Sequence, residues 1–198
     1  IDSREGVTNF VSTDGYRMSV KSTSSQKKTL KEGLIIAVGI INEVMALKDE
    51  DEIVLYLNKA ESQVIFEVGG ALIIGRIIEG KFPDYESVLP KESKTTVTFN
   101  REELLQNVRL ASVFARDSSN IANLEIVGDS MKLSTRTQGV GEGETVIECQ
   151  KKGEDNKISF NIKYLMDLLK TLSESEATLR LNSPSEPAVF DVKAKDYV

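Results

Sequence analysis

The side chains that most often carry out catalysis are scarce in this chain of 198 residues. Histidine, the commonest general base and a common metal ligand, is absent, and the single cysteine, Cys149, has no imidazole to activate it. Because Cys149 lies in a run of alternating apolar and polar residues, we expect a packed, unreactive thiol in a strand. A lone cysteine cannot form an internal disulfide, which favours a reducing cytoplasm.

Two further segments resemble catalytic or ligand-binding motifs. The acidic run at residues 49–52 could bind a metal or act in hydrolysis, but adjacent carboxylates between a helix and a strand are usually a solvated turn. The glycine-rich run at residues 139–143 lacks the Lys-Ser/Thr ending of a phosphate-binding loop and does not open a helix. The sequence therefore predicts no catalytic residues, no metal site and no cofactor.

Basic side chains on two predicted helices offer a different chemistry. Arg101 and Arg109 fall within one arc of the first of these helices, and Lys163 and Lys170 lie seven residues apart on the second. Taken alone, such faces are more often simply solvated than functional. The functional alternative is a weak, sequence-independent surface for phosphate groups. The formal net charge of −6 argues against a protein that is basic all over, but it allows a local basic face.

No segment suits a membrane or a signal peptide. The longest apolar stretch, residues 34–41, is far shorter than the roughly 20 residues needed to span a bilayer. The N-terminus has neither a basic start nor an apolar core. We therefore expect a cytoplasmic protein, and we interpret the start at Ile1, without an initiator methionine, as a cut end.

The elements that would position these residues follow an internal repeat. Residues 97–105 align with residues 158–166 at a shift of 61 residues, and more loosely with residues 36–44. Each copy is typical of a strand followed by a helix, with Asn100 and Asn161 as good N-caps and a first helix starting near Gly39. Strands are expected at residues 53–57, 64–68, 72–78, 121–127, 131–135, 145–149, 178–181 and 188–192.

This pattern predicts an α+β fold of repeated β-α-β-β-β units, each of roughly 60 residues and paired into helix-on-sheet domains. Residues 1–21 would be the closing strands of an earlier unit. Residues 81–90, which contain Pro83 and Pro90, are the best candidate for a linker between domains.

Two segments resemble motifs of the bacterial DNA sliding clamps, the beta subunit of the replicative DNA polymerase. Ser12-Thr13-Asp14-Gly15-Tyr16-Arg17-Met18 is similar to a strand turn of that family. Residues 77–90 are similar to its linker with the pattern G-K-F-P-D-Y followed by V-L-P. The turn Phe160-Asn161-x-x-Tyr164 adds a third match, and the resemblance covers essentially the whole chain.

The resemblance implies a clamp fold of three similar domains per protomer, with two protomers closed head-to-tail into a ring around double-stranded DNA. It places residues 1–91 in the later part of the middle domain and residues 92–198 in the third domain, without the C-terminal tail. The implied function is processivity for the replicative polymerase, without enzymatic activity. Arg101, Arg109, Lys163 and Lys170 would face DNA from helices that line one curved side.

The resemblance also implies a hydrophobic cleft that takes short linear peptides from the polymerase, the clamp loader and repair proteins. Its lining, carried over by motif, would be Thr13, Gly15, Tyr16, Arg17, Met18, Pro83, Ser87, Val88, Asn161, Tyr164, Pro184, Pro187 and Val198. Ser87 stands where the family often has a basic residue, and Ala37 and Gly39 replace a basic residue and a proline before the first helix.

Val113, Phe114 and the strand at residues 145–149 would meet the other protomer of the ring. Because the first domain is missing, we expect this chain not to close a ring, and to be a monomer or to make non-native contacts. Two alternatives remain. One is a repeat-built interaction module with no role at DNA, and the other is a hydrolase that uses two carboxylates converging in a cleft. On its own, the segment 13–18 would be an ordinary β-turn with Asp14-Gly15 as its turn pair.

Overall fold

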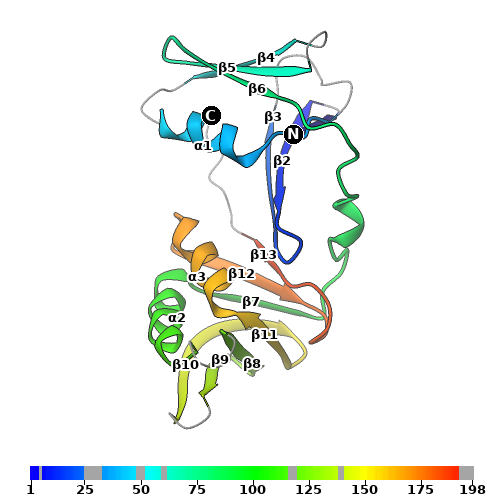
Figure 1. The fold of residues 1–198 in the computed structure, drawn as a ribbon. Helices are drawn as coiled ribbons and strands as arrows, with labels where there is room; N and C mark the ends of the chain where they lie inside the picture. The colour runs from blue at the N-terminus through cyan, green and yellow to red at the C-terminus, as the bar shows by residue number, and fades with distance from the viewer. Residues whose placement is uncertain are drawn as a thin grey trace. The chain divides into compact units, whose positions relative to one another are not determined.

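The computed structural model describes residues 1–4, 6–24, 33–47, 52–58, 62–115, 120–137 and 141–191. The chain divides into two compact units, Ile1–Pro83 and Asp84–Val198 (Figure 1). No helix within the described residues is long and apolar enough to cross a membrane.

In its described residues, the first unit has two antiparallel three-stranded sheets and one α-helix. The first sheet is formed by β1 (Asp2–Arg4), β2 (Val7–Thr13) and β3 (Met18–Ser24). The second is formed by β4 (Ile53–Asn58), β5 (Gln63–Val68) and β6 (Ala71–Arg76). The helix α1 (Val38–Ala46) packs on the second sheet through a small core of Val44, Val64, Phe66 and Val68.

The second unit is built around one antiparallel sheet of seven strands, in the order β11-β8-β9-β10-β7-β12-β13. Its elements, in chain order, are the 3₁₀ turn η2 (Glu86–Val88), β7 (Thr95–Asn100), α2 (Arg101–Ala115), β8 (Ile121–Val127), β9 (Ser130–Thr137), β10 (Gly141–Gly153), β11 (Asn156–Asn161), α3 (Ile162–Thr171), β12 (Glu176–Leu181) and β13 (Val189–Asp191). The long β10 pairs first with β9 and then, from Cys149 onward, with β7.

The repeat with a 61-residue shift is confirmed in this unit. Strands β7 and β11 begin and end 61 residues apart, and each leads directly into a helix. Asn100 Oδ1 accepts the amide of Glu103, and Asn161 Oδ1 accepts the amide of Lys163, both at 3.0 Å. Each asparagine therefore satisfies a free N–H group of the first helical turn, as the sequence predicts.

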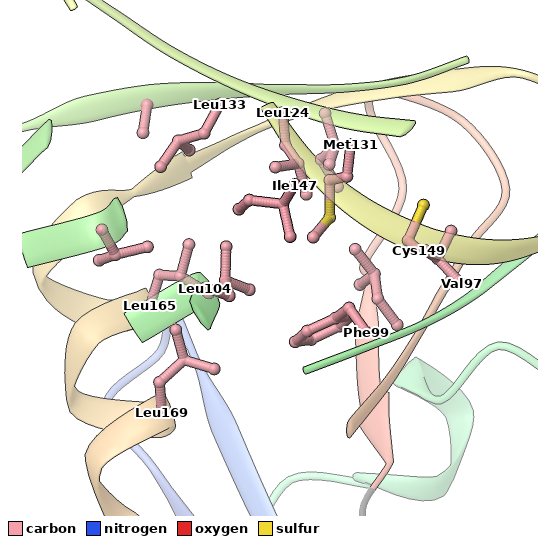
Figure 2. Packing of buried hydrophobic residues seen from close by; sticks show 14 of the residues in the cluster. Val97, Phe99, Leu104, Leu124, Met131, Leu133, Ile147, Cys149, Leu165 and Leu169 are labelled. Atoms are coloured by element: carbon pink, nitrogen blue, oxygen red, sulfur yellow. The ribbon is translucent and has the colours of Figure 1, made fainter. Parts of the chain in front are cut away.

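The two helices of this unit lie side by side and share one core with the sheet (Figure 1). Leu104 from α2 and Leu165 and Leu169 from α3 point into the same interior as Phe99 and Ile147 from the strands (Figure 2). A fully buried leucine or isoleucine side chain contributes about 1.5–3 kcal/mol relative to an exposed one. The amphipathic spacing of the leucines therefore accounts for the position of both helices.

Cys149 lies on the core side of β10 and is 8% exposed. Burial raises the pKa of its thiol, which keeps it protonated at neutral pH. The prediction of a packed, unreactive thiol is therefore confirmed.

The expected strands differ from the observed ones mainly around the first helix. The repeat copy at residues 36–44 predicts a strand before its helix, and this prediction is wrong. One isolated bridge, Ile36 to Ile77, forms there, and Val38 already belongs to α1. The strand expected at residues 72–78 ends at Arg76. The strand expected at residues 145–149 is the central part of the much longer β10.

Candidate functional site

The turn between β2 and β3 is held by its own side chains. Thr13 Oγ1 accepts a hydrogen bond from the Gly15 amide (3.1 Å) and donates one to the Arg17 carbonyl (2.9 Å). Asp14 Oδ1 accepts bonds from the amides of Tyr16 (3.0 Å) and Arg17 (2.9 Å). Asp14 Oδ2 forms an ion pair with Arg17 Nε at 3.1 Å. Gly15 has a φ of +87°, a left-handed conformation that glycine adopts without steric cost.

These bonds make the turn a preorganised surface. The two backbone amides, with the Arg17 guanidinium, hold the pKa of Asp14 below its usual value. The carboxylate is therefore ionised at neutral pH and keeps its hydrogen bonds. Tyr16, near the tip of the turn, is 85% exposed, and Met18 follows it at the start of β3, partly buried. An exposed aromatic ring on a fixed turn can bind apolar groups with little loss of conformational entropy.

The linker segment places a second set of apolar groups at the surface. Tyr85 is buried and anchors η2, whereas Val88 is 53% exposed. Ser87 Oγ donates a hydrogen bond to the Asp84 carbonyl at 2.7 Å, so this side chain is engaged within the turn. Pro83 is exposed at the end of the first unit.

The remaining residues predicted for the peptide cleft lie in the second unit. Asn161 is the N-cap of α3, so its side-chain oxygen is used by the helix. Tyr164 is partly buried on the same helix. Pro184 and Pro187 are exposed in the segment between β12 and β13. Val198 lies outside the described residues.

Arg101, which the resemblance predicts to face DNA, contacts the end of α3. Its Nε donates to the carbonyl of Glu174 at 3.1 Å, and Nη1 donates to the carbonyl of Leu169 at 3.5 Å. Nη1 also pairs with Glu102 at 3.0 Å, and the side chain is only 19% exposed. These carbonyls lie at and just beyond the C-terminal end of α3, where a cation is favoured by the helix dipole. Arg101 therefore joins the start of α2 to the end of α3.

The other residues predicted to face DNA are more exposed than Arg101. Arg109 on α2 and Lys163 and Lys170 on α3 are all exposed. The charge around them is mixed, because the first turn of α2 carries Glu102 and Glu103. Helix α1 contains one acidic residue and no basic one. The cations available to phosphate on the described helices therefore belong chiefly to the second unit.

The surface predicted for the other protomer is apolar. Val113 is 64% and Phe114 is 40% exposed near the end of α2. The Phe114 ring packs over Gly143 of β10, where an added Cβ would come within 3.2 Å of ring atom Cδ2. Over Gly141–Glu148, β10 pairs with β9 and has no strand on its other edge among the described residues.

The structure gives no support to the carboxylate-based alternatives where it describes them. Asp84 is exposed on the linker, and Glu52 is the only member of the acidic run that is described. Within the described part of the chain, no group of three or more His, Cys, Asp or Glu residues is placed to hold a metal ion.

Comparisons with known proteins identify the family. The family model of the DNA polymerase III beta subunit central domain matches residues 2–84, and that of its C-terminal domain matches residues 86–198. The chain belongs to the DNA polymerase III beta subunit family.

Individual beta subunits show how far the likeness extends. The beta sliding clamp of Synechocystis sp. is 30% identical over 91% of this chain and 50% of that protein. That of Staphylococcus aureus is 27% identical over 94% and 50%, respectively. A crystal structure of the beta chain from Streptococcus pneumoniae is 27% identical with a TM-score of 0.88, covering 98% of this chain and 52% of that one. The chain therefore spans about half the length of the beta subunits that it matches.

Sequence reasoning missed two features of this beta-subunit chain. It identified Asp14-Gly15 as the pair of a β-turn, but it did not predict that the Asp14 carboxylate accepts the amides of Tyr16 and Arg17. It also predicted Arg101 to face DNA from its charge and its position on the helix, and did not predict its contact with the end of α3. The repeat gives a clue, because the matching helix positions, Ile40 and Ile162, both pack in hydrophobic cores.

Proposed function

We propose that this chain is part of a DNA sliding clamp that confers processivity on the replicative polymerase and has no enzymatic activity. The observation that carries the proposal is the match of its two units, one after the other, to two domains of one family. In this proposal residues 1–91 belong to the middle domain and residues 92–198 to the third, in the cytoplasm. The partners would be double-stranded DNA, the polymerase, the clamp loader and repair proteins.

We further propose that short linear peptides dock on the Thr13–Met18 turn together with Val88 and Pro184. Three observations support this. Tyr16 is exposed on a turn that its own side chains hold. Val88 is exposed beside a buried anchor, Tyr85. The segment with Pro184 and Pro187 adds rigid apolar groups, because each proline ring fixes its own φ. Apolar anchors with few polar contacts are typical of such peptide sites.

Fluorescence anisotropy with a labelled peptide tests the docking proposal. The peptide carries a glutamine followed by spaced leucine and phenylalanine side chains, and it is titrated with the 198-residue chain. Met18→Glu should weaken binding about tenfold or more, because it places a charge where the peptide buries apolar groups. The matched control is Leu72→Glu, which changes an exposed apolar side chain of the same unit. Equal affinity of both variants and the unchanged chain would refute the assignment.

A second function, an interaction module with no role at DNA, is favoured by one observation. Arg101 is engaged with the end of α3, and α1 carries no basic residue, so on the described helices only Arg109, Lys163 and Lys170 remain for phosphate. A sliding clamp holds DNA by encirclement, so weak contacts suffice for the first proposal. The test is the association of the chain with a short DNA duplex at low salt. Binding that fades as salt rises supports the clamp, and no binding at any salt supports the module.

A further inference from the structure

A group of side-chain amides joins the residues that follow the linker to the turn that carries Pro184. Asn182 Oδ1 accepts the amide of Lys94 at 2.9 Å, and Asn182 Nδ2 donates to the carbonyl of Glu92 at 3.1 Å. The same Nδ2 donates to Glu186 Oε2 at 3.3 Å. One side chain thus contacts two segments that lie about 90 residues apart in the sequence.

A second asparagine holds the backbone behind this contact. Asn156 Nδ2 donates to the carbonyl of Asn182 at 3.1 Å and to Thr95 Oγ1 at 3.0 Å. Thr95 is fully buried, and its hydroxyl donates to the Glu154 carbonyl at 2.9 Å. The position of Asn182 is therefore fixed from the interior of the sheet, and only its side chain reaches outward to the two surface segments.

The turn beyond Asn182 is closed by its own hydrogen bonds. Ser183 Oγ donates to Glu186 Oε1 at 2.9 Å, and the Glu186 amide donates to the Ser183 carbonyl at 3.3 Å. Glu186 thus accepts bonds from both Ser183 and Asn182. Pro184 lies inside this closed turn, and Pro187 follows it directly.

We infer that Asn182 is a positioning residue that fixes the Ser183–Glu186 turn against the Glu92–Lys94 segment and so sets the spacing of Pro184 and Val88. This inference rests on the proposed peptide docking. Val88 precedes Glu92 by only four residues, so the contact limits how far the two apolar groups can separate. A surface whose parts are already in place loses less conformational entropy when a peptide binds, and the affinity is higher for that reason. In this role Asn182 acts through the two segments that it holds.

The first test measures the positioning itself by hydrogen–deuterium exchange of the 198-residue chain. Asn182→Ala should speed amide exchange in residues 183–187 and also in residues 86–91, where no bond to Asn182 is removed. The control Asn123→Ala removes another side-chain hydrogen bond of the same unit, to Ser159, and should change neither segment. Unchanged exchange in residues 86–91 of Asn182→Ala would overturn the inference, whether or not any peptide binds.

The second test measures the consequence for binding, with the labelled peptide described above. Asn182→Asp keeps the acceptor for Lys94, but it loses both donated bonds and places a carboxylate beside Glu186. Affinity should fall about fivefold to tenfold, as the loss of one or two hydrogen bonds implies. The double variant Asn182→Asp/Glu186→Gln restores a donor to this pair but not the bond to the Glu92 carbonyl, so it should recover only part of the affinity.

These results separate the inference from the proposed function. If the unchanged chain binds no peptide, the docking proposal fails, and the exchange experiment alone decides the positioning role. If the chain binds peptide, and Asn182→Asp and the double variant both bind it as tightly as the unchanged chain, the inference is wrong and the docking proposal stands.

Discussion

At the scale of the residue, charged side chains hold the local structure of the turn at Asp14 and of the contact between α2 and α3. Asp14 keeps the turn with Tyr16 in one conformation, and Arg101 binds carbonyls at the end of α3. Both are charged residues whose partners lie mainly in the backbone. Because hydrogen bonds to charged groups contribute about 1.5–3 kcal/mol when they are shielded from water, a partly buried side chain such as Arg101 has more to contribute than an exposed one.

The Asp14 turn should respond to acid in a defined direction. The pKa of Asp14 is lowered from its ordinary value of 3.8 by the amides of Tyr16 and Arg17. The stabilisation of the turn is therefore fully present above about pH 4, and it is lost as pH falls through the lower, folded-state pKa. We expect the Tyr16 amide resonance to titrate with a midpoint below 3.8. Asp14→Asn, which keeps an oxygen acceptor, should remove this titration, and a midpoint above 3.8 in the unchanged chain would contradict the assignment.

At the scale of the element, the sequence predicts well wherever the repeat is strict. The strand–asparagine–helix pattern located β7, α2, β11 and α3, because the Asn cap and the apolar periodicity act locally. Near α1 the pattern placed the helix start within one residue, near Gly39 against the observed Val38, but the expected strand before it is only the bridge of Ile36 to Ile77. Ala37 occupies the cap position there and makes no side-chain hydrogen bond.

The contacts of Arg101 could not be predicted in the same way. Its partners, Leu169 and Glu174, lie about 70 residues further along the chain and offer backbone carbonyls, which every residue possesses. The candidate site shares this difficulty. The Thr13–Met18 and linker motifs are visible in the sequence, but Asn182 and its bonds to residues 92–94 depend on packing between distant segments.

The contact of Arg101 with the end of α3 leads to a prediction that distinguishes a structural role of this residue from a role in DNA binding. Arg101→Gln should lower the melting temperature by several degrees, since it removes charge-assisted bonds worth about 2 kcal/mol in a partly buried site. It should leave the salt dependence of DNA association unchanged. Arg109→Gln is a matched change on the exposed face of the same helix. It should leave the melting temperature unchanged and reduce the slope of log affinity against log salt by about 0.9.

Calorimetry and duplex titrations at several salt concentrations supply these two readouts. If Arg101→Gln instead leaves stability unchanged and lowers the salt slope as Arg109→Gln does, then Arg101 faces phosphate and its contact with α3 is incidental.

At the scale of the whole molecule, the chain holds two units of a protein family whose members are about twice as long. The second unit has the larger core, with both helices on one sheet, and it carries the apolar surface of Val113 and Phe114 next to the open edge of β10. Exposed apolar groups beside an open strand edge are typical of a surface that another chain covers.

We predict that the 198-residue chain is a monomer with a mass near 21.9 kDa at micromolar concentration. At higher concentration the α2 surface should cause weak association, which Val113→Glu should abolish. The control is Val127→Glu, which changes a similarly exposed side chain on β8, outside the surface predicted for the other protomer. Multi-angle light scattering provides the measurement. A discrete dimer that traps circular DNA would contradict this view of the interface.

We propose that a short peptide docks on the Thr13–Met18 turn and on the segments around Val88 and Pro184. The most direct test is a map of amide chemical shifts of the chain as an unlabelled peptide with a glutamine and spaced leucine and phenylalanine residues is added. We expect shifts that saturate together at Gly15, Tyr16 and Val88, while the amides of β8 and β9 stay in place. Shifts confined to α2 and β10, or no saturable shift at all, would contradict it.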